Sequence, residues 1–136
     1  MRIIYDLPHV FNPLADPKEN AYVLSALLDC LVSINEAYLR DHTVLDLYHS
    51  GVVYGRTEHW DCIPALYAKG YGDCKSLSAA LIAQYRKKGI EAEPVFRWIR
   101  NSGGGTDFHI LVQTIKGFED PSKVLGMGRN ENARSR

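Results

Sequence analysis

One segment joins a glycine-rich turn to a run of apolar residues with helical spacing: Gly70-Tyr71-Gly72-Asp73-Cys74-Lys75-Ser76-Leu77-Ser78. Apolar positions recur after it at intervals of three and four residues, which predicts a helix from about Cys74 to Lys88. Cys74 would then stand at a helix N-terminus, where unpaired backbone N–H groups and the helix dipole stabilise a thiolate. Cys74 is therefore a candidate nucleophile.

Two strand-like runs follow this helix, at residues 92–99 and 107–115, with a glycine-containing loop at residues 101–105 between them. Gly89 is a helix stop signal, and Lys116-Gly117 turns the chain toward a third short extended segment. The simplest arrangement of the three segments is an antiparallel sheet packed on the central helix. The predicted fold class is therefore α+β.

The N-terminal half of the chain contains a second predicted helix, which starts at Asp16-Pro17-Lys18-Glu19 and runs to about Arg40. Asp16 can cap this helix and Pro17 suits its first position. Its apolar face is wide, so we expect other parts of the protein to cover most sides of it. Cys30, in the middle of the helix, is expected to be a small buried core residue. A short strand at 52–54 and one or two helical turns at 63–70 are also expected.

Composition and length bound the function classes. The 136 residues predict one domain at 1–125, with an extended arm at 1–15 and a polar, mobile tail at 126–136. Sixteen basic and sixteen acidic residues give zero formal net charge, which argues against a nucleic-acid or membrane-surface protein. We expect no membrane span, no signal peptide and a cytoplasmic protein whose three cysteines are thiols.

Two further residues complete a possible catalytic set. His109 lies in the stronger predicted strand, and Asp120 follows the turn after it. A nucleophile, a base and an orienting acid in this order are typical of a cysteine hydrolase or acyltransferase. Asp107 is an alternative partner for His109, because residues two apart share a strand face. Asp73 either caps the helix or, with its carboxylate turned toward the sulfur, raises the thiol pKa.

A zinc site is the chemical alternative. His59-x-x-Cys62, together with Cys74 and His109, offers zinc-ligand side chains, but the chain has no second close pair of such residues. The glycines at 103–105 follow a strand without opening a helix, so they predict a hairpin loop and not a phosphate site. We therefore expect neither a metal nor a cofactor.

The ordered set Gly72-Asp73-Cys74, His109 and Asp120-Pro121 resembles the core of the transglutaminase-like superfamily, which has a papain-like Cys-His-Asp triad. The resemblance covers about residues 60–125. It implies that Cys74 is the nucleophile, His109 the general base and Asp120 the residue that orients the imidazole. It also implies an oxyanion hole built from the Cys74 backbone N–H and one further donor. Trp60 could supply that donor through its indole N–H, or could simply be a core or cleft-wall residue.

A narrower resemblance extends over residues 48–54, 60–66 and 119–127, which are similar to small transglutaminase-like proteins encoded among bacteriophage head and tail genes. It implies a phage-encoded protein in the host cytoplasm or the virion, with phage structural proteins as possible partners. The chain departs from the superfamily where His-x-Trp-x-Glu is common, because it has His109-Ile110-Leu111-Val112-Gln113. Phe118 stands where many members have tryptophan. Substrate-cleft residues therefore do not carry over.

Two functions remain open from the sequence. One is an enzyme that attacks an amide through a thioester intermediate, with a peptide bond, a glutamine side chain or a cell-wall peptide as substrate. The other is a non-catalytic virion or assembly protein on the same fold, which would use the arm, the first helix and the tail as docking surfaces.

Overall fold

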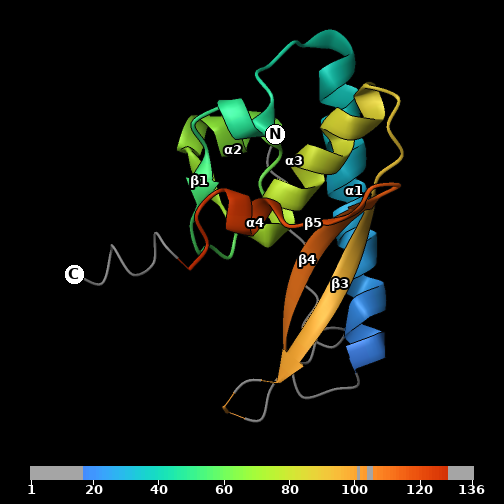
Figure 1. Cartoon of the computed structure of the whole chain (residues 1–136), viewed down its shortest axis with the longest axis vertical. Coiled ribbons are helices and arrows are strands. Elements are labelled where there is room, and N and C mark those ends of the chain that lie inside the picture. Colours follow the sequence, from blue (N-terminus) through green and yellow to red (C-terminus); the bar gives the residue numbers. More distant parts are fainter. Residues whose placement is uncertain (1–16, 101, 104–105, 129–136) are drawn as a thin grey trace, which may run out of the picture.

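The computed structural model describes residues 17–100, 102–103 and 106–128 (Figure 1). The predicted arm at 1–15 and most of the predicted tail lie outside the described residues. The elements, in chain order, are α1 (Pro17–Asp41), the 3-10 helix η1 (Leu47–His49), β1 (Val53–Tyr54), α2 (Ile63–Lys69), β2 (Tyr71–Gly72), α3 (Cys74–Lys87), β3 (Glu93–Arg100), β4 (Thr106–Thr114), β5 (Gly117–Glu119) and α4 (Pro121–Val124).

Helix α3 is the centre of the molecule and has the predicted bounds to within one residue. Every residue from its start to Gln84 is buried, because α1, α2, α4 and the sheet all contact it. Three alanines, Ala79, Ala80 and Ala83, are fully buried and allow neighbouring elements to approach closely. The helix ends at Lys87, and Gly89, just beyond the C-cap Lys88, has a φ of +79°, the left-handed conformation that favours glycine.

The three-stranded sheet has the order β3-β4-β5 and is antiparallel, as predicted (Figure 1). Strand β5 pairs only with the end of β4, from Val112 to Thr114. The part of β4 that precedes Val112 lies against the start of α3, where the Ser78 hydroxyl donates to the Ile110 carbonyl at 3.2 Å. Ile110 and Val112 are fully buried. The mixed helix-and-sheet architecture agrees with the predicted α+β class.

A second, two-stranded sheet was not predicted. Strands β1 and β2 pair in parallel, which places the segment before α3 next to residues far back in the sequence. Helix α2 ends at Gly70, where φ is +83°, as expected of a glycine stop. The first residues of the predicted tail, 126–128, belong to the fold: they continue a turn that begins at Leu125, and Met127 packs against the core.

Helix α1 has the predicted length but not the predicted burial. Leu28, Val32 and Leu39 face the core, whereas Tyr22 is 79% exposed and Ile34 is 41% exposed. Only one face of α1 contacts α3. The expectation that other parts of the protein cover most sides of this helix is therefore wrong. Cys30 lies on the outer face and is exposed, which corrects its expected burial.

Helix α1 is long and apolar enough to be considered as a membrane span. By length and composition alone, Ala21–Asp41 could cross a membrane, with a mean hydropathy of 1.3 over an 18-residue window. The core helix of a globular protein passes the same test, and 33% of that window is buried in the protein. Within the described residues it is the one helix of this kind, and it gives no clear membrane span.

Candidate active site

Cys74 is the first residue of α3, as the sequence predicted. Asp73 is the N-cap, and its side chain accepts a hydrogen bond from the Lys75 backbone N–H at 3.1 Å. This satisfies one of the unpaired N–H groups of the first helical turn. The cap explains why the helix begins at Cys74, directly after Asp73.

Cys74 is only 8% exposed, and the backbone of Ile110, the residue that follows His109 in β4, favours its thiolate form by hydrogen bonding. Burial raises the thiol pKa from its ordinary 9.0 to about 11, and the Asp73 carboxylate adds to the rise. The bond with Ile110 and the charge of Lys75 act in the opposite direction but are smaller. The expectation of a thiolate stabilised by the helix N-terminus is therefore wrong for this structure, in which the thiol is protonated at neutral pH.

His109 pairs with Asp120. The His109 Nε2 and an Asp120 carboxylate oxygen are 2.8 Å apart, and both side chains are mostly buried. Asp120 is also the N-cap of α4, where its other carboxylate oxygen accepts from the Lys123 backbone N–H at 3.3 Å. Asp107 is exposed and forms no ion pair with His109 within the described residues. Of the two acids that the sequence offered, Asp120 is the partner of the imidazole.

One open cleft of about 1390 Å³ contains the candidate residues. Its lining includes Cys74, His109, Asp120, Asp73 and Trp60. The cysteine comes from the start of α3, the histidine from the middle of β4 and the aspartate from the β5–α4 junction. The fold thus brings into one cleft three side chains that the sequence separates by up to 46 positions (120 minus 74).

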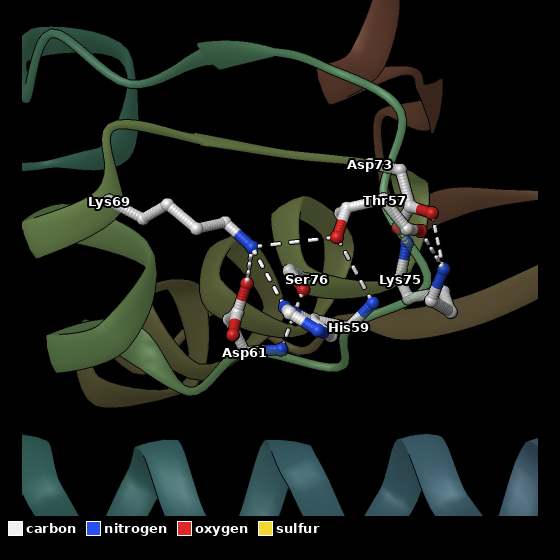
Figure 2. A network of polar contacts seen from close by, with 7 residues as sticks. All are labelled: Thr57, His59, Asp61, Lys69, Asp73, Lys75 and Ser76. Atoms are coloured by element: carbon white, nitrogen blue, oxygen red, sulfur yellow. Dashed lines mark hydrogen bonds and ion pairs between the residues drawn. The ribbon is translucent and has the colours of Figure 1, made fainter.

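The segment at residues 55–62, which we call the Trp60 loop, forms another part of the cleft wall. Figure 2 shows that two lysines hold it. Lys75 donates to the Thr57 carbonyl at 3.1 Å and pairs with the Asp73 carboxylate, while Lys69 contacts Asp61 at 2.6 Å. The Lys75 ammonium also lies 5.7 Å from the Trp60 ring centre.

Trp60 itself is partly buried, packs against the core and lines the cleft. Among the hydrogen bonds of the described residues, none involves its indole N–H. The position therefore fits a cleft-wall residue, and the oxyanion-donor role stays a hypothesis.

Two charged residues of the site were missed by the sequence reasoning. Lys75 is buried, although lysine is rarely so without a partner. Glu119 accepts hydrogen bonds from the hydroxyls of Tyr85, at 2.7 and 3.0 Å, and Tyr48. Burial, with Glu119 as the next cause, raises the pKa of Tyr85 to about 12 and raises that of Tyr48 further. No local pattern signals these contacts, because the tyrosines are 34 and 71 positions away from Glu119.

The zinc alternative receives no support. No group of three or more histidine, cysteine, aspartate or glutamate side chains with metal-binding geometry occurs in the described part of the chain. His59 instead contacts the Lys69 ammonium at 3.5 Å, in the network of Figure 2. Cys62 is the N-cap residue of α2.

Comparisons with protein-family models, with curated proteins and with solved structures find no match for this chain. The geometry of the cleft and the chemistry of its side chains are therefore the basis for assigning a function.

Proposed function

We propose that the protein is a cysteine hydrolase or acyltransferase with a transglutaminase-like core, which attacks an amide through a thioester intermediate. The observation that carries this proposal is the His109–Asp120 contact of 2.8 Å in the cleft that Cys74 also lines. The Cys74 sulfur lies beside the backbone of Ile110, the residue next to His109. A nucleophile, a base and a group that orients the base thus converge from three elements.

The protonated thiol defines the first chemical step. Asp120 holds Nε2 of His109, so Nδ1 is the ring nitrogen that remains to take the thiol proton. As the Cys74 sulfur attacks the amide carbonyl carbon, its proton passes to His109, and the Asp120 carboxylate stabilises the imidazolium. His109 then returns this proton to the leaving nitrogen as the C–N bond breaks, which leaves a thioester on Cys74.

The second step releases the acyl group. Water, or an amine in an acyl transfer, attacks the thioester carbonyl, and His109 accepts a proton from the attacking group before returning it to the sulfur. In this proposal the backbone N–H of Cys74, at the start of α3, stabilises the negative oxygen of both tetrahedral intermediates. Processing of a structural protein or a step in particle assembly is the biological role that the phage resemblance suggests.

The rate of Cys74 alkylation tests the proposal. Iodoacetamide is added to the native protein at neutral pH, and the three cysteines are followed separately as tryptic peptides by mass spectrometry. We expect His109→Ala to slow Cys74 alkylation on the order of 100-fold, because the imidazole no longer accepts the thiol proton. Cys30 is exposed and is the internal control, which should react equally in both proteins. Equal Cys74 rates in the two proteins would refute the catalytic proposal.

A non-catalytic virion or assembly protein is the second candidate. Two observations favour it: the thiol pKa is raised and not lowered, and α1 leaves an apolar face uncovered in the described structure. In that case Cys74 would be a buried structural cysteine, and Cys74→Ser would leave particle assembly unchanged. An assembly defect in Cys74→Ser with normal folding would instead support the enzyme.

A further inference from the structure

The cleft contains a positive charge beside His109. Arg97 in β3 lies directly opposite His109 in the antiparallel register, so the two side chains are on the same face of the sheet. Phe118 in β5 is opposite Gln113, which shares that face with His109 because the two are four residues apart on one strand.

The Arg97 side chain extends across this face. Its guanidinium carbon is 5.3 Å from the ring centre of Phe118, and β4 lies between the two strands that carry these residues. The guanidinium group therefore reaches over β4 on the side that carries His109. Arg97, Phe118 and His109 all line the cleft that contains Cys74.

Three of the five carboxylates that line the cleft are engaged elsewhere. Asp120 pairs with the imidazole, Asp73 with a lysine, and Glu119 accepts from two tyrosines. The other two, Asp107 on the same sheet face and Glu58 in the Trp60 loop, are exposed, yet within the described residues no carboxylate forms an ion pair with Arg97. A cleft arginine without an internal carboxylate partner offers its N–H groups to a ligand.

We propose that Arg97 binds a carboxylate of the substrate, so that the amide attacked by Cys74 belongs to a molecule with a carboxylate close to the reacting carbonyl. A guanidinium group binds a carboxylate through two parallel hydrogen bonds. The contact with Phe118 limits the conformations of the side chain, which reduces the entropy lost on binding. This inference rests on the proposed role of Cys74.

Two alkylating reagents of nearly the same size test the inference. Iodoacetate carries a carboxylate, and iodoacetamide carries a neutral amide. With either reagent, the Cys74 sulfur forms a bond to the CH₂ carbon, iodide leaves with the electrons of the C–I bond, and the thiol proton passes to His109. The ratio of the two rate constants measures the preference for a carboxylate and cancels changes in thiol reactivity.

We expect Arg97→Gln to lower the iodoacetate-to-iodoacetamide ratio at Cys74 by about three- to fivefold at low ionic strength. Arg97→Lys keeps the charge but not the two parallel hydrogen bonds, so it should retain only part of the preference. Added salt should weaken the preference in the wild-type protein. Arg40→Gln removes an exposed arginine at the end of α1 and is the matched control, with no change expected. The ratio at Cys30 should be the same in all variants.

The outcomes separate the two proposals. If Arg97→Gln leaves the ratio unchanged while His109→Ala still slows both reagents, the carboxylate site is refuted and the catalytic proposal stands. If His109→Ala slows neither reagent, the catalytic proposal itself fails. A lower ratio in Arg97→Gln, partly restored in Arg97→Lys, supports the carboxylate site.

Discussion

At the scale of single residues, the buried thiol of Cys74 determines what its neighbours must do. With a pKa of about 11, it gives almost no thiolate at neutral pH unless another group takes its proton. Asp73, which caps the helix, opposes ionisation because its charge has the same sign as a thiolate. In the proposed mechanism, activation therefore comes from His109, and the quality of that base depends on how Asp120 holds it.

The two aspartates near His109 provide a matched pair for the first prediction. Asp120→Asn replaces the carboxylate that accepts from Nε2, so the imidazole is held less well and its protonated form is less stable. We expect Cys74 alkylation by iodoacetamide to slow on the order of tenfold or more. Asp107→Asn should leave the rate within about twofold, since an exposed acid without this contact contributes little.

The same two variants also test the alternative in which His109 pairs with Asp107. If Asp107→Asn slows the thiol and Asp120→Asn does not, the pairing of His109 in solution differs from the structure. Circular dichroism of both variants controls for folding, because Asp120 also caps α4 and its replacement removes one helix contact.

The three candidate catalytic residues were easier to find from the sequence than the residues around them. Cys74 and its N-cap Asp73 follow from local helix-start signals. The sequence left Asp107 and Asp120 open as partners of His109, and the observed contact with Asp120 decides between them. Lys75 and Glu119 could not be found in this way, because their partners come from other elements. The thiol pKa was predicted in the wrong direction, since burial depends on packing that no local pattern reveals.

At the scale of elements, the Trp60 loop is held to the start of α3 by buried polar contacts. The Asp61 backbone N–H donates to the Ser76 hydroxyl at 2.9 Å, and Lys75 joins Thr57 to Asp73 (Figure 2). These contacts fix one wall of the cleft against the helix that begins with Cys74. The loop and the helix are thus expected to behave as one unit.

Lys75 and Lys69 are a second matched pair. Lys75→Met removes a side chain that is only 8% exposed and leaves the Asp73 carboxylate and the Thr57 carbonyl without it. We expect the free energy of unfolding in urea to fall by about 1–3 kcal/mol. Lys69→Met disrupts the more exposed pair with Asp61 and should cost less than about 1 kcal/mol.

The thiol gives a second readout for the same variants. Without the lysine charge, which lowers its pKa, Cys74 should react more slowly with iodoacetamide in Lys75→Met than in Lys69→Met. Equal losses of stability in the two variants, or a faster Cys74 reaction in Lys75→Met, would contradict the assigned role of Lys75.

Most elements were predictable because they are local. Helices α1 and α3 follow from apolar spacing and their glycine, proline and aspartate signals, and β3 and β4 from runs of strand-forming residues around a glycine loop. The parallel pairing of β1 with β2 was not, since it joins two-residue strands 18 positions apart (Val53 with Tyr71). Such pairing is decided by tertiary contacts and not by strand propensity.

At the scale of the whole molecule, burial is concentrated around α3. This helix is covered along its first three turns, whereas α1 contributes one face and exposes the other. The sequence pattern of α1 shows how wide its apolar stripe is, but not how much protein is available to cover it. For that reason the length of α1 was predicted correctly and its burial was not.

The buried thiol also makes global stability depend on alkaline pH. Its pKa is raised in the folded protein, so the folded state binds this proton more tightly than the unfolded state does. The resulting stabilisation is complete below the ordinary pKa of 9.0 and is lost as the pH rises through about 11. The pKa of Tyr85 is likewise raised from 10.0 to about 12, so its ionisation causes a further loss of folding stability at higher pH.

Cys74→Ala isolates the contribution of the thiol. We expect the free energy of unfolding, measured in urea at a series of pH values, to fall less steeply between the two pKa values of 9.0 and about 11 in this variant than in the wild-type protein. Cys30→Ala removes an exposed thiol and should follow the wild-type curve. Comparing slopes avoids the cavity that alanine leaves in the core, because that cost does not depend on pH. Parallel curves for Cys74→Ala and Cys30→Ala would show that the Cys74 thiol ionises as easily in the folded protein as in the unfolded chain, and that burial does not hold it protonated.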